Sequence, residues 1–278
     1  MQHFFKEQLQ IFLTAVMFYT RIPCPKWITH EAYYLNKATI YFPIIGWIVG
    51  GYSAFVFILT SSLVGVGVGL ALSMVGSIFL TGAFHEDGLA DVCDGFGGGW
   101  TKPKILEIMK DSRIGTYGVI GLMSVLILKY LLLTENLRLL LSGTSRRIDF
   151  WTTLTNPLLW ALFVVPHTLS RLTALTFIFT HTYVRENEDS KAKPVANLLS
   201  LNELLLAFAF GLLPLIGLVF WTKQFNFLLL LLPLVLLKMY LGWYFQKWIG
   251  GYTGDCLGAT QQISEVVLYM AWLVLCTQ

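Results

Sequence analysis

Long runs of apolar residues alternate with short polar stretches along this chain, and this pattern predicts membrane-spanning helices. A helix needs about 20 apolar residues to cross the hydrocarbon core of a bilayer. Seven segments reach or approach that length. They are residues 38–60, 63–84, 114–134, 151–180, 199–221, 226–246 and 262–277. Within each segment apolar side chains lie on all sides of the helix, as expected for helices surrounded by lipid and by other helices.

Two regions need a closer interpretation. The segment 151–180 is long and contains Pro166, so it is either one kinked helix or two shorter ones. The first 20 residues mix apolar residues with Lys6, Glu7 and Gln8 and show no cleavable signal peptide, which favours an amphipathic helix on the membrane surface over a first spanning helix. We therefore expect an all-α, polytopic membrane bundle of about seven transmembrane helices with an amphipathic N-terminal segment. Without a repeat or linker, residues 1–278 form a single expected domain.

The composition agrees with a membrane protein and excludes some other classes. Hydrophobic residues make up 56% of the chain and charged residues only 13%, whereas a soluble domain has about 25% charged residues. The net charge of +3 leaves no basic surface of the size that nucleic acid requires. The four cysteines lack the spacing of zinc or redox sites, so we expect free thiols.

The charged residues gather in three polar stretches, at residues 85–113, 181–197 and 247–261. If the spanning segments alternate in direction, all three stretches lie on the same side of the membrane. Their basic residues assign that side to the cytoplasm by the positive-inside rule. Three arginines between residues 138 and 147 fall on the opposite side and weigh against this orientation.

The first polar stretch carries a pattern typical of a metal site. Asp87, Asp91 and Asp94 are spaced four and three residues apart, which on a helix places them within an arc of about 60°. Three like charges on one face repel each other unless a cation lies between them. Oxygen ligands favour Mg²⁺, Ca²⁺ or Mn²⁺ over zinc. We predict that these aspartates bind a divalent ion; the alternative is a solvated acidic cap at a helix end.

Basic residues follow in the same stretch. Lys110 and Arg113 are three residues apart, so on a helix they face one ligand, and arginine suits bidentate contact with phosphate. We predict that both bind substrate, together with Ser112 between them. Anchoring of the chain at the membrane surface is the alternative role for the basic residues of this stretch.

The last spanning segment and the fourth one each contain a charged residue. If the chain is helical from Asp255, that residue shares an arc of about 80° with Glu265. Acids within a membrane are costly and point toward partners or cavities. We predict that Glu265 and Arg171 contact substrate; the alternatives are a glutamate hydrogen-bonded to a neighbouring helix and an arginine that extends toward the membrane surface.

Four pieces of the chain, in order, resemble the cobalamin synthase family of adenosylcobinamide-GDP ribazoletransferases. They are Arg21-Ile22-Pro23 with residues 42–46, residues 85–95, residues 106–116, and residues 250–259 with Glu265. Together they span nearly the whole chain, and the second and third pieces are long and specific. The segments 135–150 and 181–197 match less clearly, so the contacts to the nucleotide base and to ribazole are not indicated.

The resemblance implies a reaction. The hydroxyl of α-ribazole, or of α-ribazole 5′-phosphate, attacks the phosphorus joined to cobinamide; GMP leaves, and adenosylcobalamin or its phosphate forms. The resemblance also implies Mg²⁺ as cofactor and a multi-pass position in the bacterial inner membrane, with the active site facing the cytoplasm. The expected partners are the two substrates and the lipid bilayer, with no nucleic acid, and a homo-oligomer is compatible with these expectations.

Phosphoryl transfer needs a metal ion, cations on the phosphate oxygens and a base for the attacking hydroxyl. The three aspartates would hold the metal, while Lys110 and Arg113 would contact the phosphates. Asp94 and Asp255 are both candidates for the base, so we take these two residues and Arg113 as the candidate catalytic residues.

Two other functions deserve comparison with this one. A CDP-alcohol phosphotransferase-like lipid enzyme also uses aspartates at the membrane edge, but its motif places Ala-Arg after Asp-Gly and adds two spaced aspartates, which this chain lacks. A cation transporter would carry acids in the middle of several spans. Most acids here lie in the polar stretches between spans, which favours an enzyme.

Overall fold

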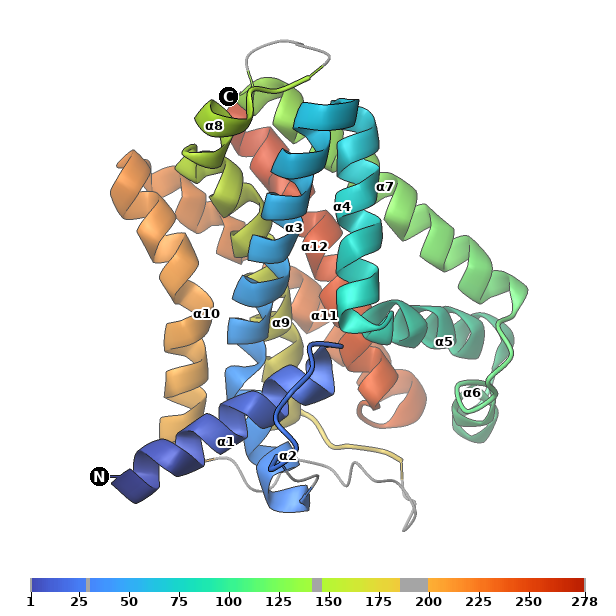
Figure 1. The fold of residues 1–278 in the computed structure, drawn as a ribbon. Helices are drawn as coiled ribbons and strands as arrows, with labels where there is room; N and C mark the ends of the chain where they lie inside the picture. The colour runs from blue at the N-terminus through green and yellow to red at the C-terminus, as the bar shows by residue number, and fades with distance from the viewer. Residues whose placement is uncertain (1, 29–30, 142–146, 186–199, 278) are drawn as a thin grey trace.

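The computed structural model describes residues 2–28, 31–141, 147–185 and 200–277, and within them it is built from helices, with one isolated β-bridge (Figure 1). Helices labelled η are 3₁₀ helices. In chain order the elements are α1 (Gln2–Tyr19), α2 (Ala32–Ala38), η1 (Thr39–Tyr41), α3 (Phe42–Val64), α4 (Val66–Thr81), α5 (Phe84–Gly98), α6 (Lys102–Ile108), α7 (Thr116–Leu140), α8 (Phe150–Leu154), α9 (Pro157–Thr180), α10 (Leu201–Thr222), η3 (Phe225–Leu230), α11 (Leu231–Ile249) and α12 (Gly254–Thr277).

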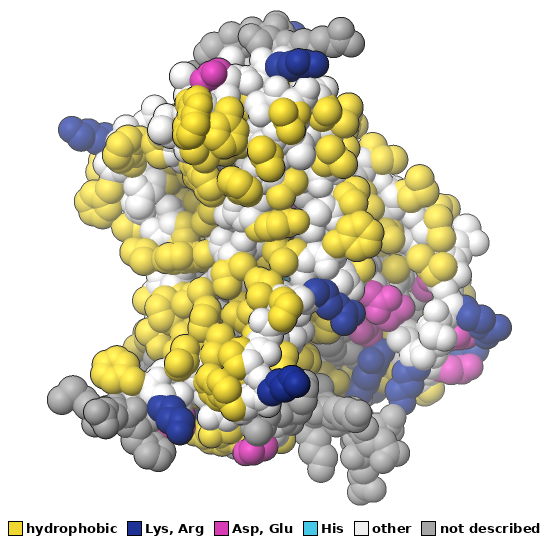
Figure 2. Space-filling model, in the orientation of Figure 1, with side chains coloured by type: hydrophobic (Ala, Val, Ile, Leu, Met, Phe, Trp, Pro, Cys, Tyr) yellow, Lys and Arg dark blue, Asp and Glu magenta, His cyan; other side chains and the backbone are white. Residues whose placement is uncertain are grey.

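Six helical segments among the described residues are long and apolar enough to cross a membrane, and the bent pair α4–α5 makes a seventh if it counts as one span. The six are Ala32–Val64, Thr116–Leu140, Pro157–Thr180, Leu201–Thr222, Phe225–Ile249 and Gly254–Thr277. Figure 2 shows the broad hydrophobic surface that such helices present. The predicted class, an all-helical membrane bundle of about seven spans, is confirmed.

The structure refines two of the predicted segments. The region 151–180 is divided, because α8 ends at Leu154 and Asn156 then caps α9 by accepting the backbone N–H groups of Leu158 and Leu159. Pro166 lies inside α9 without ending it. The last helix starts at Gly254, eight residues before the predicted start, so the polar sequence around Asp255 belongs to the same helix as the final span.

The N-terminal helix α1 is not among the candidate spans. It buries Ile11, Ala15 and Val16 in a cluster shared with α2 and α3, and it exposes Phe5 and Leu9. Figure 1 shows α1 lying across the lower end of α3 rather than alongside it. This arrangement agrees with the amphipathic segment predicted from the sequence.

Helix α9 is the most deeply buried of the candidate spans. It packs against α3 at two glycines: a Cβ atom on Gly46 would lie 2.5 Å from the carbonyl oxygen of His167, and one on Gly50 would lie 2.7 Å from the Cα of Val164. Glycines allow this close backbone contact, which is a common way for helices to associate in lipid. The centre of the bundle is therefore tightly packed around α9.

Helices α4 and α5 meet at an angle of 89°. Gly82 and Ala83 form the corner, with φ angles of 67° and 57° in the left-handed region. Glycine adopts this conformation readily and ends α4 with a standard cap, whereas it is unusual for alanine. Because of this corner, α5 runs at right angles to α4 and carries its acidic residues along one end of the bundle (Figure 1).

Candidate functional site

The acidic residues of α5 lie beside the start of α12. A Cβ atom on Gly88 of α5 would lie 3.0 Å from the Cα of Asp255, and one on Gly258, one turn later in α12, would come equally close to the α5 backbone. The two helices therefore cross with their backbones in contact. Asp87 and Asp91 flank Gly88, and Asp91 lies within electrostatic range of both Asp87 and Asp255.

Three carboxylates are accessible at this crossing: Asp87 is exposed, and Asp91 and Asp255 are half-buried. Figure 2 shows acidic and basic side chains gathered on the part of the surface where α5 lies. These are the all-oxygen donors that Mg²⁺ prefers. Among the described residues, no three His, Cys, Asp or Glu side chains converge on one point that could hold a metal ion. Metal binding by Asp87 and Asp91 therefore stays a prediction.

Asp94, the third predicted ligand, faces a different element. Its two carboxylate oxygens accept the backbone N–H groups of Gly115, at 2.6 Å, and of Gly118, at 2.8 Å. These N–H groups belong to the start of α7, where a carboxylate is favoured by the unpaired donors and by the helix dipole. Asp94 is buried in this position. A role as metal ligand or base would require Asp94 to release those donors.

Asp255 is held by an arginine to which the sequence assigned no role. Arg185 places its Nη2 atom 2.6 Å from the Oδ2 atom of Asp255 and 2.9 Å from the carbonyl oxygen of Met109, to which it donates. The pair thus joins the three polar stretches that the sequence placed on one side. The available signal was the position of Arg185 in the stretch 181–197, but nothing in its neighbours indicated a partner.

A short backbone pairing holds Arg185 in place. Val184 donates its N–H to the carbonyl of Tyr252, and Tyr252 donates to the carbonyl of Thr182, at 3.0 and 2.9 Å. Gly251 is required beside this pairing, because its φ is 155° and a Cβ atom would lie 2.0 Å from the carbonyl oxygen of Thr182. Burial raises the pKa of Tyr252 above its ordinary value of 10.

The predicted phosphate-binding residues lie outside a helix. Helix α6 ends at Ile108, so the three-residue spacing of Lys110 and Arg113 does not place them on one helical face, which corrects the geometry assumed from the sequence. Arg113 is highly exposed and binds Asp111 through Nε, 3.0 Å from Oδ1, and Nη2, 2.6 Å from Oδ2. These hydrogen bonds lower the pKa of Asp111 to about 2.

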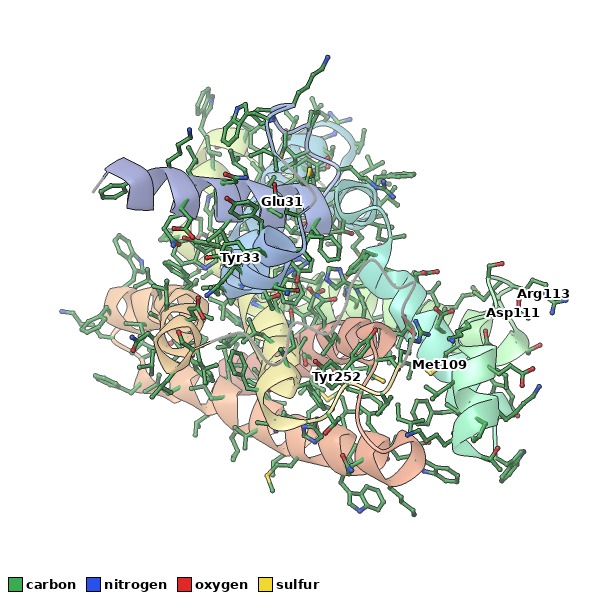
Figure 3. The ribbon with its side chains drawn as sticks, turned by 90° about the horizontal axis from the view of Figure 1, so that it is seen from below. Glu31, Tyr33, Met109, Asp111, Arg113 and Tyr252 are labelled. Atoms are coloured by element: carbon green, nitrogen blue, oxygen red, sulfur yellow. The ribbon has the colours of Figure 1, made fainter. Side chains whose placement is uncertain are left out.

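Figure 3 shows this pair at the outer edge of the molecule, beyond Met109, with Tyr252 nearer the middle. Lys110 and Ser112 are exposed in the same segment. Substrate contact by Lys110, Ser112 and Arg113 stays a prediction.

Arg171 and Glu265 lie in the interior of the bundle, each only 1% exposed. The carboxylate of Glu265 binds Nζ of Lys129 at 2.7 Å and Nδ1 of His167 at 2.6 Å, and it also accepts from Gln261. Arg171 lies 3.5 Å from the same carboxylate. Direct contact of either residue with substrate stays a prediction, and it would require the surrounding helices α7, α9 and α12 to open.

Comparison with known proteins gives a consistent result. Residues 11–273 match the family model of cobalamin-5-phosphate synthase. The chain is 45% identical to the adenosylcobinamide-GDP ribazoletransferase of Shewanella oneidensis over 269 residues, which covers 96% of this chain and 95% of that protein. It is 42% identical to the protein of the same name from Shewanella piezotolerans, with 97% and 96% of the two chains covered. No solved structure matches the chain at a significant level.

Proposed function

The chain belongs to the cobalamin-5-phosphate synthase family, and on that premise we propose that it is a membrane-embedded adenosylcobinamide-GDP ribazoletransferase. The relatives carry that activity in their names and cover nearly the whole chain. It is a transferase of cobalamin biosynthesis, and several of its helices are long and apolar enough to span the membrane.

The proposed reaction exchanges one ester of a phosphorus atom for another. The hydroxyl oxygen of α-ribazole, or of its 5′-phosphate, forms a bond to the phosphorus joined to cobinamide. The bond from that phosphorus to the GMP oxygen breaks, and GMP leaves. The hydroxyl proton passes to a base. The name of the family, which specifies a 5-phosphate product, favours the phosphorylated acceptor.

The crossing of α5 and α12 is the observation that carries the proposal. It gathers the accessible carboxylates Asp87, Asp91 and Asp255 at one end of the bundle, with Arg185 beside them. We propose that Asp87 and Asp91 hold Mg²⁺, with Asp255 beside them. When bound, Mg²⁺ neutralises charge on the diphosphate. Arg185 binds Asp255 directly, and Lys110, Ser112 and Arg113 remain candidates for contact with the outer part of the substrate.

Asp255 is our preferred base. Asp94, the other candidate, gives both of its carboxylate oxygens to N–H groups at the start of α7. Asp255 has one oxygen, Oδ2, bound by Arg185, which holds the side chain in one orientation. The other oxygen has no hydrogen bond from the described residues that would compete for a proton. We propose that this oxygen takes the proton of the attacking hydroxyl.

The orientation we propose places the crossing of α5 and α12 at the cytoplasmic surface. The basic residues of the stretch 85–113 support this side. The diphosphate-containing substrate carries a nucleotide, and nucleotides are available in the cytoplasm. The arginines between residues 138 and 147 argue for the opposite side, so the orientation needs a direct measurement with a membrane-impermeant label on the exposed α6 segment.

The decisive experiment uses the full-length protein purified in nanodiscs. Incubation with adenosylcobinamide-GDP, α-ribazole 5′-phosphate and Mg²⁺ should release GMP and form the cobalamin phosphate. Both products are measured by liquid chromatography and mass spectrometry. A chelator or Asp91→Asn should abolish the reaction. Glu107→Gln is the matched control, because Glu107 is an exposed acid of α6 whose ion pair, among the described residues, is with Lys104. A folded protein that releases no GMP with Mg²⁺ present would refute the proposal.

A further inference from the structure

The contact between α5 and α12 has two separate edges. Gly88 forms the first edge, against the backbone around Asp255. Glu86 forms the second, because its Oε1 atom accepts a hydrogen bond of 2.8 Å from Nε2 of Gln262. Positions two residues apart on a helix point about 160° apart. Glu86 and Gly88 therefore mark opposite edges of the α5 face that packs on α12.

The glycine contact by itself does not fix the roll of α5 about its axis. Leu89 and Val92 of α5 pack in a buried cluster with Cys256 and Ala259 of α12, and Asp94 binds the start of α7; apolar packing is non-directional, and Asp94 lies about two turns away from the crossing. The Glu86–Gln262 hydrogen bond acts on the other edge and opposes that roll. Both side chains are buried, Glu86 at 7% and Gln262 at 2% exposure, so water does not compete well for their hydrogen bond.

Lys129 of α7 fixes the direction of this hydrogen bond. Its ammonium donates to Oε1 of Gln262 at 2.7 Å and to Oε2 of Glu265 at 2.7 Å. Because Lys129 can only donate, it binds the amide oxygen of Gln262 and turns the amide NH₂ group toward Glu86. The network therefore runs from Glu265 through Lys129 and Gln262 to Glu86, and it links α12, α7 and α5.

A small cavity with both polar and apolar walls lies beside the end of this network. It has a volume of about 20 Å³, and its lining includes Glu86, Lys129, Ser73 and Tyr269. That is enough space for one water molecule. Oε2 of Glu86 and the hydroxyl of Tyr269 are buried and have no other partner among the described residues. The second oxygen of Glu86 thus borders a space of the size of one water molecule, beside the side chains of Ser73 and Lys129.

We propose that Glu86 and Gln262 are positioning residues that set the rotation of α5 and thereby the placement of its outer carboxylates against Asp255. The inference rests on the proposed function, since it concerns the same site. A carboxylate about 6 Å from a helix axis moves by about 1 Å when the helix rolls by about 10°. A misplacement of that size can lower an enzyme's rate about 100-fold.

The first test measures the rotation without substrate or metal. Spin labels are attached to Gly98→Cys, at the exposed end of α5, and to Gly254→Cys, where a side chain meets open space, in a chain whose native cysteines are replaced. Pulsed electron resonance in nanodiscs gives the distribution of the distance between the labels. Glu86→Leu should broaden this distribution. Glu86→Gln, which keeps an acceptor oxygen for Gln262, should not.

Asn136→Leu is the matched control for this measurement. Asn136 is buried in α7 and donates to the carbonyl of Tyr269 in α12 at 2.9 Å, so its replacement also removes a buried polar contact to α12 but leaves α5 untouched. It should leave the distance distribution narrow. An unchanged distribution in Glu86→Leu, or equal broadening in Asn136→Leu, would overturn the positioning role.

The second test is a reciprocal exchange followed by activity. Gln262→Glu sets two carboxylates against each other in the interior and should lower kcat about 100-fold with little change in KM. Adding Glu86→Gln restores one amide and one carboxylate, with Lys129 still bound to residue 262, and should recover most of the rate. If the double variant is as impaired as Gln262→Glu, the inference fails. This test does not use Glu86→Leu, so it also applies if that variant does not accumulate in the membrane. A wild-type protein that makes no GMP refutes the proposed function instead, whatever the spin labels show.

Discussion

Arg185 and Asp255 form a partly buried ion pair in which Nη2 and Oδ2 are 2.6 Å apart. The same guanidinium donates to the carbonyl of Met109. Arg185 therefore joins Met109, which lies 76 positions before it in the sequence, to Asp255, which lies 70 positions after it. This pair gives Asp255 a fixed orientation beside the α5 carboxylates, and it offers a positive charge next to the place where we propose that the diphosphate binds.

The two arginines near the site should differ in importance. Arg185 binds both partners through Nη2. Arg185→Lys keeps the charge, but its ammonium lies one bond closer to the backbone and falls short of that position. We therefore expect kcat/KM to fall about tenfold or more, a loss of about 1.4 kcal/mol of transition-state stabilisation. Arg113→Lys should cost less, because the Arg113 side chain is exposed and, among the described residues, binds Asp111. Steady-state kinetics of both variants decide. A larger loss at Arg113 would support the diphosphate contact that the sequence predicts for it.

Asp91 and Asp94 should have separable effects. Asp91→Asn should abolish turnover without lowering the melting temperature. Asp94→Ala removes a carboxylate from the start of α7 and should destabilise the protein by about 1 kcal/mol, which corresponds to a shift of about 2–4 °C for a chain of this size. Intrinsic fluorescence during heating measures the shift. An Asp94→Ala variant with unchanged melting temperature but no activity would favour Asp94 as a metal ligand or base.

The glycine crossing should be sensitive to a single methyl group. Gly88→Ala and Gly258→Ala each place a Cβ atom 3.0 Å from the backbone of the opposite helix, so the helices must move apart. Alanine favours a helix by about 1 kcal/mol over glycine, so any loss has to come from the contact itself. We expect lower activity in both variants. Gly254→Ala is the control, since its Cβ atom meets no neighbour within 4 Å. Equal losses of activity in all three variants would show that the close contact at the crossing is not the cause.

The Asp111–Arg113 pair should resist acid. Hydrogen bonds from Arg113 lower the pKa of Asp111 from its ordinary value of 3.8 to about 2. A lowered carboxyl pKa means that the interaction is fully present above the ordinary value and is lost as the pH falls through about 2. The ¹³C carboxyl signal of Asp111, assigned with Asp111→Asn, should therefore show no titration between pH 4 and pH 8. Arg113→Gln should move the midpoint up toward 3.8, and an unmoved midpoint would show that the pair does not form.

The spanning helices were predictable because their signal is local. Each one is a run of apolar residues whose length is set by the bilayer, so the sequence of one segment is enough to identify it. The corner at Gly82 and Ala83 was not visible in the same pattern. The sequence predicted a spanning helix over residues 63–84 that ends at the membrane surface, with the acidic stretch after it. Nothing in the composition of these residues indicates an 89° turn between two helices.

The spacing of the aspartates predicted a helix but not what each residue faces. Asp94 has its partners at Gly115 and Gly118, more than 20 residues later, and helical periodicity does not report such contacts. The partner of Lys129 could not be predicted either, because Lys129 is a single charged residue in an apolar segment. A lone lysine in the middle of a span is itself a signal for a buried partner, and Glu265, the acid of the last span, is that partner.

The pairing of Lys129 with Glu265 has a consequence for how the protein is made. The two residues are 136 positions apart in the chain, so at translation rates of 5–20 residues per second the ribosome needs roughly 7–27 s to supply the second after the first. During that interval an ammonium in the middle of α7 lacks its carboxylate, at a cost of about 3 kcal/mol on the insertion scale. We therefore expect stable insertion of α7 to depend on the final helix. A chain that ends before residue 254 should be held in the membrane less stably, because Lys129 then lacks Glu265 as its partner.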